Sequence, residues 1–331
     1  MKAEKKIRDS LINIKNRLMN YNSFLLTTHL SPDGDGIGAI LALGLTLRKL
    51  NKDVEWLVLD PIPNMYKFLP SVTEIKSSVE EISDFNKRQI IIIDSSDLER
   101  VGGWTKQIDS NRQLIFNLDH HISNTNFGDF QLVNSEAASV CELIYSLIVE
   151  LDQEISRDVA TCLLTGLITD TGCFRFSNTT TDTFELAIKL INLGGEYRKI
   201  ITNVYETKSY QEVLLLGKTL NTLVLEKEGR LAWLVIDLNT IRNLGIDSEQ
   251  TESIVNLARN IEGVKLAILF KQVEDGVVKV SFRSREDVDV AKLALEFGGG
   301  GHPRASGCSL KSTTLQQAQE LVLNKARKLF D

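Results

Sequence analysis

The hydrophobic positions in the first half of the chain fall into short, continuous apolar runs that alternate with longer runs of helical period. The apolar runs are "SFLLTT" (23–28), "DVEWLVL" (53–59), "QIIIID" (89–94) and "RQLIFNL" (112–118). They are apolar on both faces and rich in Ile, Leu and Val, which is typical of buried strands in a parallel sheet. Because helical patterns such as "GIGAILALGLTLRKLN" (36–51) separate them, the chain predicts an α/β domain with a mostly parallel sheet flanked by helices.

Beyond residue 135 the apolar spacing changes to that of helices, and after residue 222 it changes again. Helices are predicted over 136–150, 155–169, 180–193 and 195–222. Hairpin-like patterns follow at 222–236 and 264–284, then a glycine-rich stretch at 297–310 and a helix from about 314. We expect three parts, which are an α/β domain over 1–200, a helical linker over 201–215 and a smaller α+β domain over 216–331.

Composition and charge narrow the class of protein. With 331 residues, 43% of them hydrophobic and 25% charged, the chain has the profile of a two-domain globular protein. The formal net charge of −6 argues against a protein that coats long duplex nucleic acid. The charged amphipathic N-terminus lacks the apolar core of a signal peptide, and the four cysteines form no C-x-x-C pair. We expect a cytoplasmic protein with reduced thiols and no membrane partner.

The stretch "TTHLSPDGDGIGAI" (27–40) supports two different hypotheses. Its "GDGIGA" fits the G-x-G-x-x-G/A fingerprint of dinucleotide-binding folds, in which backbone N–H groups hold a pyrophosphate. The same loop carries His29, Asp33 and Asp35, and the two carboxylates that flank Gly34 would repel a pyrophosphate. We therefore favour a metal site over a nicotinamide cofactor, and we interpret the glycines as spacers that let a tight loop aim both carboxylates.

Acidic and histidine residues follow the ends of four predicted elements. They are His29, Asp33 and Asp35 after the first strand, Asp94 after the third, Asp119, His120 and His121 after the fourth, and Asp170 at the end of a helix. In open parallel sheets, ligands bind outside the carboxyl ends of the strands. Three of these groups are therefore expected at one sheet edge, and Asp170 joins them if its helix packs there. Taken singly, Asp94 and Asp119 are better explained as helix N-caps and "DGDG" as a polar turn, and only their occurrence together in this order favours a site.

Carboxylates at close range repel one another and raise each other's pKa, so divalent cations are expected to offset their charge. Mixed Asp and His ligands suit Mn²⁺, Fe or Zn better than Mg²⁺ or Ca²⁺. The candidate ligands are His29, Asp33, Asp35, Asp94, His120 and Asp170. This set is too large for one ion and fits two ions that share a carboxylate. Two such ions are typical of phosphoryl transfer, because they stabilise the attacking and the leaving oxygen.

The glycine-rich stretch supplies a second set of candidate residues, which suit a phosphate or a base. Consecutive glycines let backbone N–H groups approach a ligand closely, and a flexible turn is the alternative. Guanidinium groups nearby suit phosphate recognition. The candidate substrate-binding residues are Ser281, Arg283, Gly299, Gly300, Gly301, His302 and Arg304. Further candidates, for which a structural salt bridge or a solvated position is the alternative, are Arg100, Arg175 and Arg285.

These motifs resemble those of the DHH phosphoesterase superfamily. The segments "HLSPDGDGIGA", "IIIDSSDLERVG", "NLDHHISNTNFGD" and "LLTGLITDTGCFRFSNT" are similar to its four motifs, in the same order, and "SFRSREDVDVAKLALEFGGGGHPRASG" is similar to its companion DHHA1 domain. The resemblance implies a catalytic, metal-binding DHH domain over 1–200, a helical linker over 201–215 and a DHHA1 substrate-binding domain over 216–331, with the active site in the cleft between the domains.

The resemblance also implies roles for individual residues. One ion would be held by His29, Asp33 and Asp94, and the other by Asp35, Asp94, His120 and Asp170, with Mn²⁺ the usual metal. His121 would lie near the scissile phosphate, and Asp119 would orient a histidine. The candidate catalytic residues are therefore His121, Asp94 and Asp119.

Within the family, the compact two-domain plan resembles the NrnA-type oligoribonucleases. That resemblance implies hydrolysis of very short oligoribonucleotides to mononucleotides and of 3′-phosphoadenosine 5′-phosphate (pAp) to AMP. A related alternative is a phosphodiesterase for pApA or cyclic di-AMP. An alternative from another class is a non-catalytic nucleotide sensor, but its signature would be lost metal ligands, and every expected ligand is present. The sequence does not fix the oligomeric state, and a homodimer is one arrangement that it allows.

Overall fold

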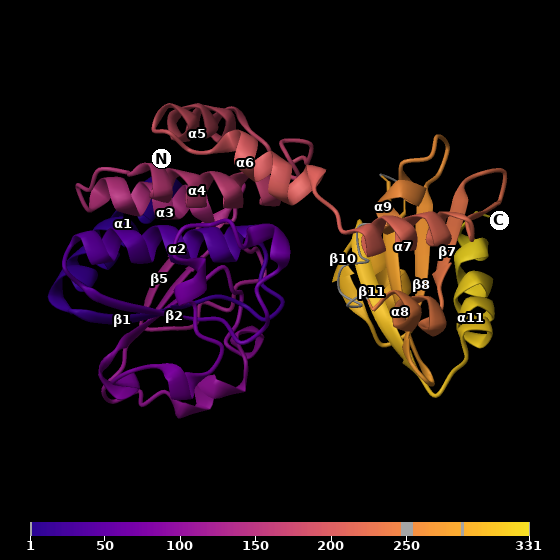
Figure 1. Ribbon diagram of the computed structural model, residues 1–331, viewed down its shortest axis with the longest axis horizontal. Coiled ribbons are helices and arrows are strands. Elements are labelled where there is room, and N and C mark those ends of the chain that lie inside the picture. Colours follow the sequence, from indigo (N-terminus) through magenta and orange to yellow (C-terminus); the bar gives the residue numbers. More distant parts are fainter. Residues whose placement is uncertain (1, 246–253, 286–287, 331) are drawn as a thin grey trace. The chain divides into compact units, whose positions relative to one another are not determined.

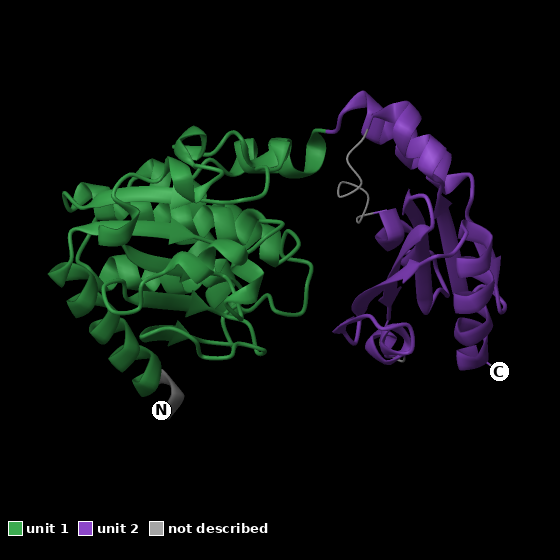
Figure 2. Ribbon diagram, turned by 90° about the horizontal axis from the view of Figure 1, so that it is seen from below, with its two compact units in different colours: residues 1–207 green, residues 208–331 purple. Residues whose placement is uncertain are grey.

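The computed structural model describes residues 2–245, 254–285 and 288–330. The chain divides into two compact units, Met1–Thr207 and Lys208–Asp331, which we call the first unit and the second unit (Figure 2). In the described parts of the chain, no helix combines the length and the apolar composition that crossing a bilayer requires.

A five-stranded sheet forms the centre of the first unit (Figure 1). Its strands are β1 (Ser23–Thr27), β2 (Asp53–Leu57), β3 (Gln89–Ile93), β4 (Ile115–Asp119) and β5 (Phe130–Val133). Every neighbouring pair is parallel, in the order β2-β1-β3-β4-β5. This confirms the predicted parallel sheet and its first four strands. The sequence pattern missed β5, because only Leu132 of its four residues is buried and no continuous apolar run results.

The two faces of this sheet are covered in different ways. Phe24, Leu26 and Ile91 pack against α-helices, which lie over one face in Figure 1. The helices that contact the strands are α1 (Lys2–Asn20), α2 (Gly34–Lys49) and α3 (Val140–Glu150). A further layer is formed by α4 (Arg157–Asp170), which packs on α2 and α3, and by α5 (Thr181–Asn192) and α6 (Tyr197–Ile201), which pack on α4. Leu25 and Ile92 point to the other face, where they pack against apolar residues of the segment 79–104. Because both faces of the sheet are buried, each of these strands is a continuous run of apolar residues in the sequence.

The second of these faces is covered by a segment that carries short 3₁₀ helices in place of α-helices. Those at this face are η3 (Val79–Glu81), η4 (Phe85–Lys87), η5 (Glu99–Val101) and η6 (Gly103–Gln107). Tyr66 of η1 (Asn64–Tyr66) and Val72 of η2 (Val72–Glu74) instead pack into the core on the side of the α-helices. Val79, Ile82 and Trp104 are the buried residues that this segment contributes against the sheet, together with Val101. The connection between β2 and β3 is therefore compact without a regular helix.

Helix α2 begins two residues earlier than predicted. Asp33 is its N-cap, and the Asp33 carboxylate accepts hydrogen bonds from the backbone N–H groups of Asp35 and Gly36, both at 3.0 Å. The glycines of "GDGIG" therefore lie inside the helix and not in a loop, so our interpretation of them as loop spacers was wrong. A Cβ on Gly34 would meet the Thr169 side chain, and one on Gly38 would meet the backbone oxygen of Cys162. The glycines permit close packing of α2 on α4.

Gly38→Ala is expected to destabilise the protein by about 1–3 kcal/mol, because its Cβ would collide with backbone that cannot rotate away. Gly217→Ala is the matched control. Gly217 also lies in a helix, α7 (Tyr210–Leu220), but a Cβ there meets open space, so this change is expected to stabilise by about 0.5–1 kcal/mol. Urea unfolding of both variants measures the difference, and equal effects at the two positions would contradict the packing argument.

The predicted continuous helix over 195–222 is wrong. After α6 the chain forms one π-helical turn, η7 (Thr202–Glu206), and Thr207 is then extended. Helix α7 starts afresh at Tyr210, with Ser209 as its N-cap in a capping box with Glu212. The boundary between the two units falls within this break. The S-x-x-E spacing of Ser209 and Glu212 is the sequence signal that marks the new helix.

The second unit is built on a six-stranded sheet with the order β10-β11-β9-β8-β7-β6. Its elements are α7, β6 (Val224–Glu226), β7 (Leu231–Ile236), α8 (Leu238–Leu244), α9 (Ile254–Arg259), β8 (Leu266–Glu274), β9 (Val277–Ser284), α10 (Val290–Leu295), β10 (Gly300–His302), β11 (Ala305–Lys311), α11 (Leu315–Arg327) and η9 (Lys328–Phe330). The pairs β6–β7 and β8–β9 are antiparallel, as the two hairpin patterns predicted, whereas β7 and β8 run parallel.

Each face of this second sheet packs against its own set of helices. Ile268, Val280 and Phe282 pack on the side of α10 and α11. Leu234 and Leu269 point to the opposite face and pack on the side of α7, α8 and α9. The alternation of β9 between buried and less buried residues follows from this arrangement. The expected smaller α+β unit is therefore present.

Candidate metal centre

Acidic and histidine side chains meet at the carboxyl edge of the first sheet. His29 follows β1 by two residues, Asp94 follows β3 directly, and His120 and His121 follow β4. Asp170 is the last residue of α4, which packs along α2. The structure thus brings the candidate ligands together from separate segments, as the sequence argument expected for strands of a parallel sheet.

The candidate ligands form three overlapping groups whose ligand atoms lie within 4.8 Å of one another. The groups are His29, Asp33 and Asp94; Asp35, His120 and Asp170; and Asp94, His120 and His121. The His29 Nε2 atom lies 3.6 Å from Asp94 Oδ2, and the His120 Nε2 atom lies 3.5 Å from Asp94 Oδ1. Asp94 therefore stands between the two histidines, with one carboxylate oxygen toward each.

Both histidines are held by their other ring nitrogen. The His29 Nδ1–H donates to the Leu30 carbonyl at 2.7 Å, and the His120 Nδ1–H donates to the Ala137 carbonyl at 3.1 Å. In the neutral ring, these bonds fix the tautomer in which Nε2 carries the lone pair that a cation can bind. A ring N–H that donates to a backbone carbonyl is the usual outer support of a histidine metal ligand.

Asp94 provides the sharpest test of whether cations fit this centre. Its side chain is only 2% exposed, and among the described residues its Oδ1 atom makes no hydrogen bond, although ring nitrogens of His120 and His121 lie 3.5 and 3.6 Å away. A buried carboxylate oxygen without a hydrogen bond is costly unless a cation compensates it. The Asp94 backbone is also left-handed, with φ = 61°, a conformation that Asp adopts more readily than most residues. These features fit a carboxylate that bridges cations.

The charges in the centre shift the pKa values of its members strongly. Burial and the charge of Asp94 raise the pKa of Asp35 to about 7, and burial and the charge of Asp35 raise that of Asp170 to about 8. Burial alone would lower the pKa of His29 and His120, but hydrogen bonds and neighbouring carboxylates outweigh it and raise the two values to about 9 and about 10. Without cations the centre retains protons, so divalent cations fit its chemistry.

Asp35 is anchored at the N-terminus of α3. The hydroxyl of Ser139, which is the N-cap of that helix, donates to Asp35 Oδ1 at 2.6 Å. The backbone N–H groups of Val140 and Cys141 donate to the same carboxylate at 2.7 and 3.2 Å. The positive end of the helix dipole and three donors thus hold this carboxylate in place. The sequence reasoning missed Ser139, although its S-x-x-E spacing with Glu142 indicates a helix start.

His121, which belongs to the group with Asp94 and His120, is also paired with Asp119. The His121 Nδ1–H donates to Asp119 Oδ1 at 2.7 Å, and Asn124 donates to the other oxygen at 2.6 Å. Asp119 is fully buried and belongs to none of the three ligand groups, whereas the side chain of His121 is 33% exposed. Asp119 therefore lies where it orients His121, whose Nε2 atom is left for other contacts.

The glycine-rich residues of the second unit lie at one edge of its sheet. In register, His302 on β10 lies beside Ala305 on β11, which lies beside Arg283 on β9. Ser281 lies two residues from Arg283, so it shares a sheet face with Arg283 and His302. Ala305 lies between His302 and Arg283 in this row. Gly300 and Gly307 lie in register with Ser281 in the row two residues away.

The glycines of this stretch differ in their surroundings. A Cβ on Gly299 would meet the backbone of Gly307. A Cβ on Gly301, whose φ is 136°, would meet Ser306, whereas a Cβ on Gly300 would meet open space. Two of the glycines are therefore required by close packing of β10 on β11. Gly300, like Gly298, has open space where a side chain would project.

The remaining arginine candidates differ in what they contact. The Arg304 guanidinium donates to the backbone carbonyls of Arg285 and Val288, and Arg175 Nε donates to the Gly172 carbonyl at 2.6 Å. The side chains of Arg100 and Arg285 are exposed. Arg100 contributes its carbonyl to the Leu30 N–H at 2.7 Å, which ties the segment after β3 to the segment after β1.

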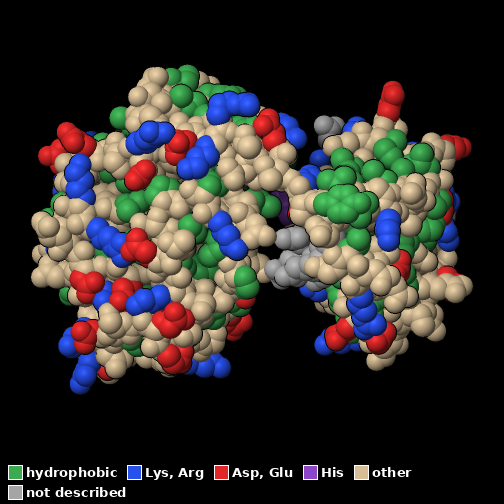
Figure 3. Space-filling model, viewed as in Figure 1, with side chains coloured by type: hydrophobic (Ala, Val, Ile, Leu, Met, Phe, Trp, Pro, Cys, Tyr) green, Lys and Arg blue, Asp and Glu red, His purple; other side chains and the backbone are tan. Residues whose placement is uncertain are grey.

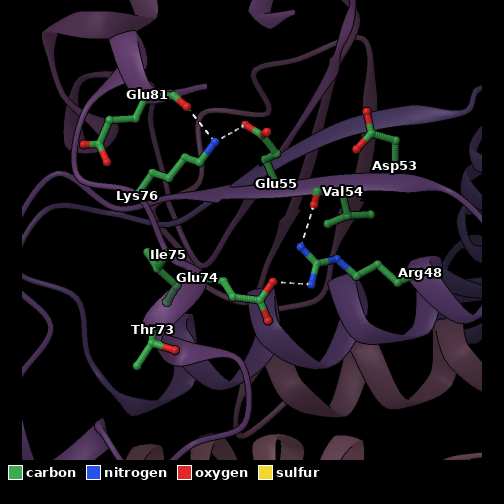
Figure 4. A pocket seen from close by; sticks show the side chains of 9 residues that line it. All are labelled: Arg48, Asp53, Val54, Glu55, Thr73, Glu74, Ile75, Lys76 and Glu81. Atoms are coloured by element: carbon green, nitrogen blue, oxygen red, sulfur yellow. Dashed lines mark hydrogen bonds and ion pairs between the residues drawn. The ribbon is translucent and has the colours of Figure 1, made fainter. Parts of the chain in front are cut away.

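A cavity of about 510 Å³ lies elsewhere in the first unit, beside the edge strand β2 (Figure 4). Its charged walls pair with each other, Arg48 with Glu74 at 2.6 Å and Lys76 with Glu55 at 3.0 Å. It shares no residue with the three ligand groups. Its charged residues are thus used for structure, and the chemistry of the first unit is concentrated at the carboxyl edge of the sheet.

Comparison with known proteins gives matches over most of the chain. The DHH family N-terminal domain matches residues 23–167, and the DHHA1 domain matches residues 229–330. The bifunctional oligoribonuclease and PAP phosphatase NrnA of Thermus thermophilus is 34% identical over 92% of this chain and 89% of its own length. The enzyme of the same name from Bacillus subtilis is 30% identical over 88% and 90%. A crystal structure of an exopolyphosphatase-related protein from Bacteroides fragilis has a TM-score of 0.89, 25% identity and 98% coverage of both chains.

Proposed function

The chain belongs to the DHH family, and we propose that it is a hydrolase that cleaves very short oligoribonucleotides to mononucleotides and converts pAp to AMP. The observation that carries this proposal is the convergence of His29, Asp33, Asp35, Asp94, His120 and Asp170 around a buried carboxylate oxygen that makes no hydrogen bond within the described structure. The names of the relatives from Thermus thermophilus and Bacillus subtilis support the choice of substrates.

We propose two divalent cations, one held by His29, Asp33 and Asp94 and the other by Asp35, Asp94, His120 and Asp170. The groups His29, Asp33 and Asp94 and Asp35, His120 and Asp170 support this choice, and Asp94 Oδ1 lies 3.5 Å from His120 Nε2. When bound, such ions supply Lewis-acid stabilisation of the charge that develops on phosphate oxygens, and they activate water. We propose Mn²⁺ because mixed imidazole and carboxylate ligands suit it. The protein contributes the fixed Nε2 lone pairs and the anchored carboxylates that set this arrangement before substrate binds.

His121 is the side chain best placed to act on the substrate phosphate. Asp119 holds its Nδ1–H, so the exposed Nε2 atom keeps one direction. In its neutral form Nε2 accepts a hydrogen bond, and when protonated it donates one to a phosphate oxygen or to the leaving oxygen. Asp119 acts through His121 by fixing the orientation of the imidazole ring.

We propose that the second unit binds the nucleotide end of the substrate. Arg283 and His302 lie in one row of the sheet, and Gly300 on the same strand as His302 has open space where a side chain would project. A guanidinium and backbone N–H groups suit a phosphate, and an imidazole ring suits stacking on a base. On the face shown in Figure 3, acidic and basic side chains are interspersed over the first unit, without the continuous basic surface that a long nucleic acid needs.

The test is product analysis with purified protein and Mn²⁺ on labelled RNA dinucleotides, longer RNA oligomers, pAp, pApA and cyclic di-AMP. We expect mononucleotides from the dinucleotides and AMP from pAp, with slower cleavage of longer oligomers, and no product after chelation. Turnover confined to pApA or cyclic di-AMP would favour the related phosphodiesterase. Nucleotide binding without turnover of any substrate would favour a sensor and would overturn the proposal.

A further inference from the structure

The short segment 137–140, just before and at the start of α3, supports two members of one ligand group. The Ala137 carbonyl accepts from His120 Nδ1 at 3.1 Å. The Ser139 hydroxyl and the Val140 N–H donate to the Asp35 carboxylate at 2.6 and 2.7 Å. The group that contains Asp35, His120 and Asp170 therefore has two of its three members fixed to one stretch of backbone.

The third member, Asp170, reaches the same stretch through Asn178. The Asn178 Nδ2 group donates one hydrogen bond to the Ala138 carbonyl at 3.0 Å and another to the Asp170 carbonyl at 3.1 Å. Both acceptors are carbonyls, so the amide nitrogen is the only end of the side chain that fits there. The C-terminal end of α4 is thereby joined to the start of α3 by one carboxamide.

The chain between Asp170 and Asn178 contains a turn with three consecutive left-handed residues. Gly172, Cys173 and Phe174 are all left-handed, with φ = 55°, 59° and 62°. For Cys173 and Phe174 this conformation is strained, and it persists only where surrounding contacts impose it. Asp170 stands at the first end of this turn, and the Asn178 bonds join that end to the start of α3.

The other ligand group is supported independently. His29 is held by its own neighbour Leu30, and Asp33 by the first turn of α2. Asp94 is positioned by its own N–H, which donates to the Leu118 carbonyl at 2.9 Å. Among the hydrogen bonds of the described residues, none links these three ligands directly to the segment 137–140 or to Asn178.

We propose that Asn178 is a positioning residue that holds Asp170 in register with Asp35 and His120, and so sets the affinity of one ion without affecting the other. This inference rests on the proposed two-ion function. Asn178 is not a ligand in it. With its two hydrogen bonds, all three members of the group Asp35, His120 and Asp170 are connected to the segment 137–140.

The experiment is a calorimetric titration of Mn²⁺ into the metal-free full-length chain, for the wild type and for Asn178→Ala. We expect the wild type to bind two ions. In the variant, one ion should bind about 10–100-fold more weakly, which is the usual effect of removing an outer support, while the other keeps its affinity. Thr179→Val is the matched control, because in the described structure the neighbouring Thr179 hydroxyl is buried without a hydrogen-bond partner. Its two affinities should match those of the wild type.

The outcomes separate this role from the proposed function. Two unchanged ions in Asn178→Ala, or two ions weakened equally, would overturn the role of Asn178 alone. A wild type that binds no Mn²⁺ would overturn the proposed function and this role with it. Circular dichroism checks the fold of each variant. If Asn178→Ala is unfolded, Asn178→Ser decides, since its hydroxyl keeps at most one of the bonds and should still weaken one ion selectively.

Discussion

Asp94→Asn is expected to lower the hydrolysis of dinucleotides and of pAp on the order of 10³-fold, with the protein still folded. Asp94 is the member that links the two histidine-containing halves of the centre, with one oxygen toward His29 and one toward His120. An amide of the same shape removes the charge that two cations would share, and a loss of about 4 kcal/mol of transition-state stabilisation corresponds to this factor. Asn also tolerates the left-handed backbone at this position, so strain does not confuse the result.

Rates at saturating Mn²⁺ measure this effect, and thermal melting checks that the variant is folded. Asp97→Asn is the matched control. Asp97 lies in the same turn after β3, accepts the Arg100 N–H at 2.9 Å and belongs to none of the ligand groups. Its variant should retain activity within a few-fold of the wild type. An Asp94→Asn protein with a tenth or more of the wild-type rate would contradict a bridging role for Asp94.

The metal-free protein is expected to become less stable as the pH rises from about 6 to about 9, by about 2 kcal/mol or more. Asp35 and Asp170 have folded pKa values of about 7 and about 8, far above those of an unfolded chain, so the folded state binds more protons in this range. His29 and His120, raised to about 9 and about 10, contribute stability that is fully present below pH 6.5 and is lost above. All four pKa values are raised in the folded state, so each group lowers the free energy of unfolding as the pH rises.

Cations should reverse this trend, because they compete with the protons for the same atoms. Their affinity is therefore expected to rise with pH, and at a concentration 100 times the dissociation constant they add about 2.7 kcal/mol of stability. Urea unfolding at several pH values, with and without Mn²⁺, measures both effects. Asp170→Asn removes one of the titrating groups and should flatten the metal-free curve between pH 6 and 8. A metal-free stability that increases with pH in this range would contradict the pKa argument.

The positions of the candidate ligands could be predicted from the sequence because they depend on topology more than on detail. Strands that are buried on both faces have a strong apolar signal, and residues that follow parallel strands must lie at one edge. Only Asp170 required a further condition, the packing of its helix. The glycines Gly34 and Gly38 allow α2 to approach α4 closely and so satisfy it.

The supports of these ligands could not be predicted, since they are contacts between distant residues with ordinary local roles. Ser139 looks like a helix cap, and the distance of 104 residues between it and Asp35 leaves no local trace. Asn178 contacts Ala138 across 40 residues and looks like a turn residue in the sequence. The break near Ser209 and the short strand β5 were missed for another reason, namely that local capping and partial burial outweigh apolar periodicity there.

The order of the candidate ligands along the chain decides when the centre can form during synthesis. His29 and Asp94 leave the ribosome long before Asp170, and Asn178 leaves it last. Until α4 has been made and has packed along α2, a nascent chain can pair its strands but lacks the last carboxylate of one group. Full loading with cations is then a late event in the maturation of the first unit. Binding of cations by every ligand group would therefore indicate that the whole segment from β1 to the turn after α4 has folded.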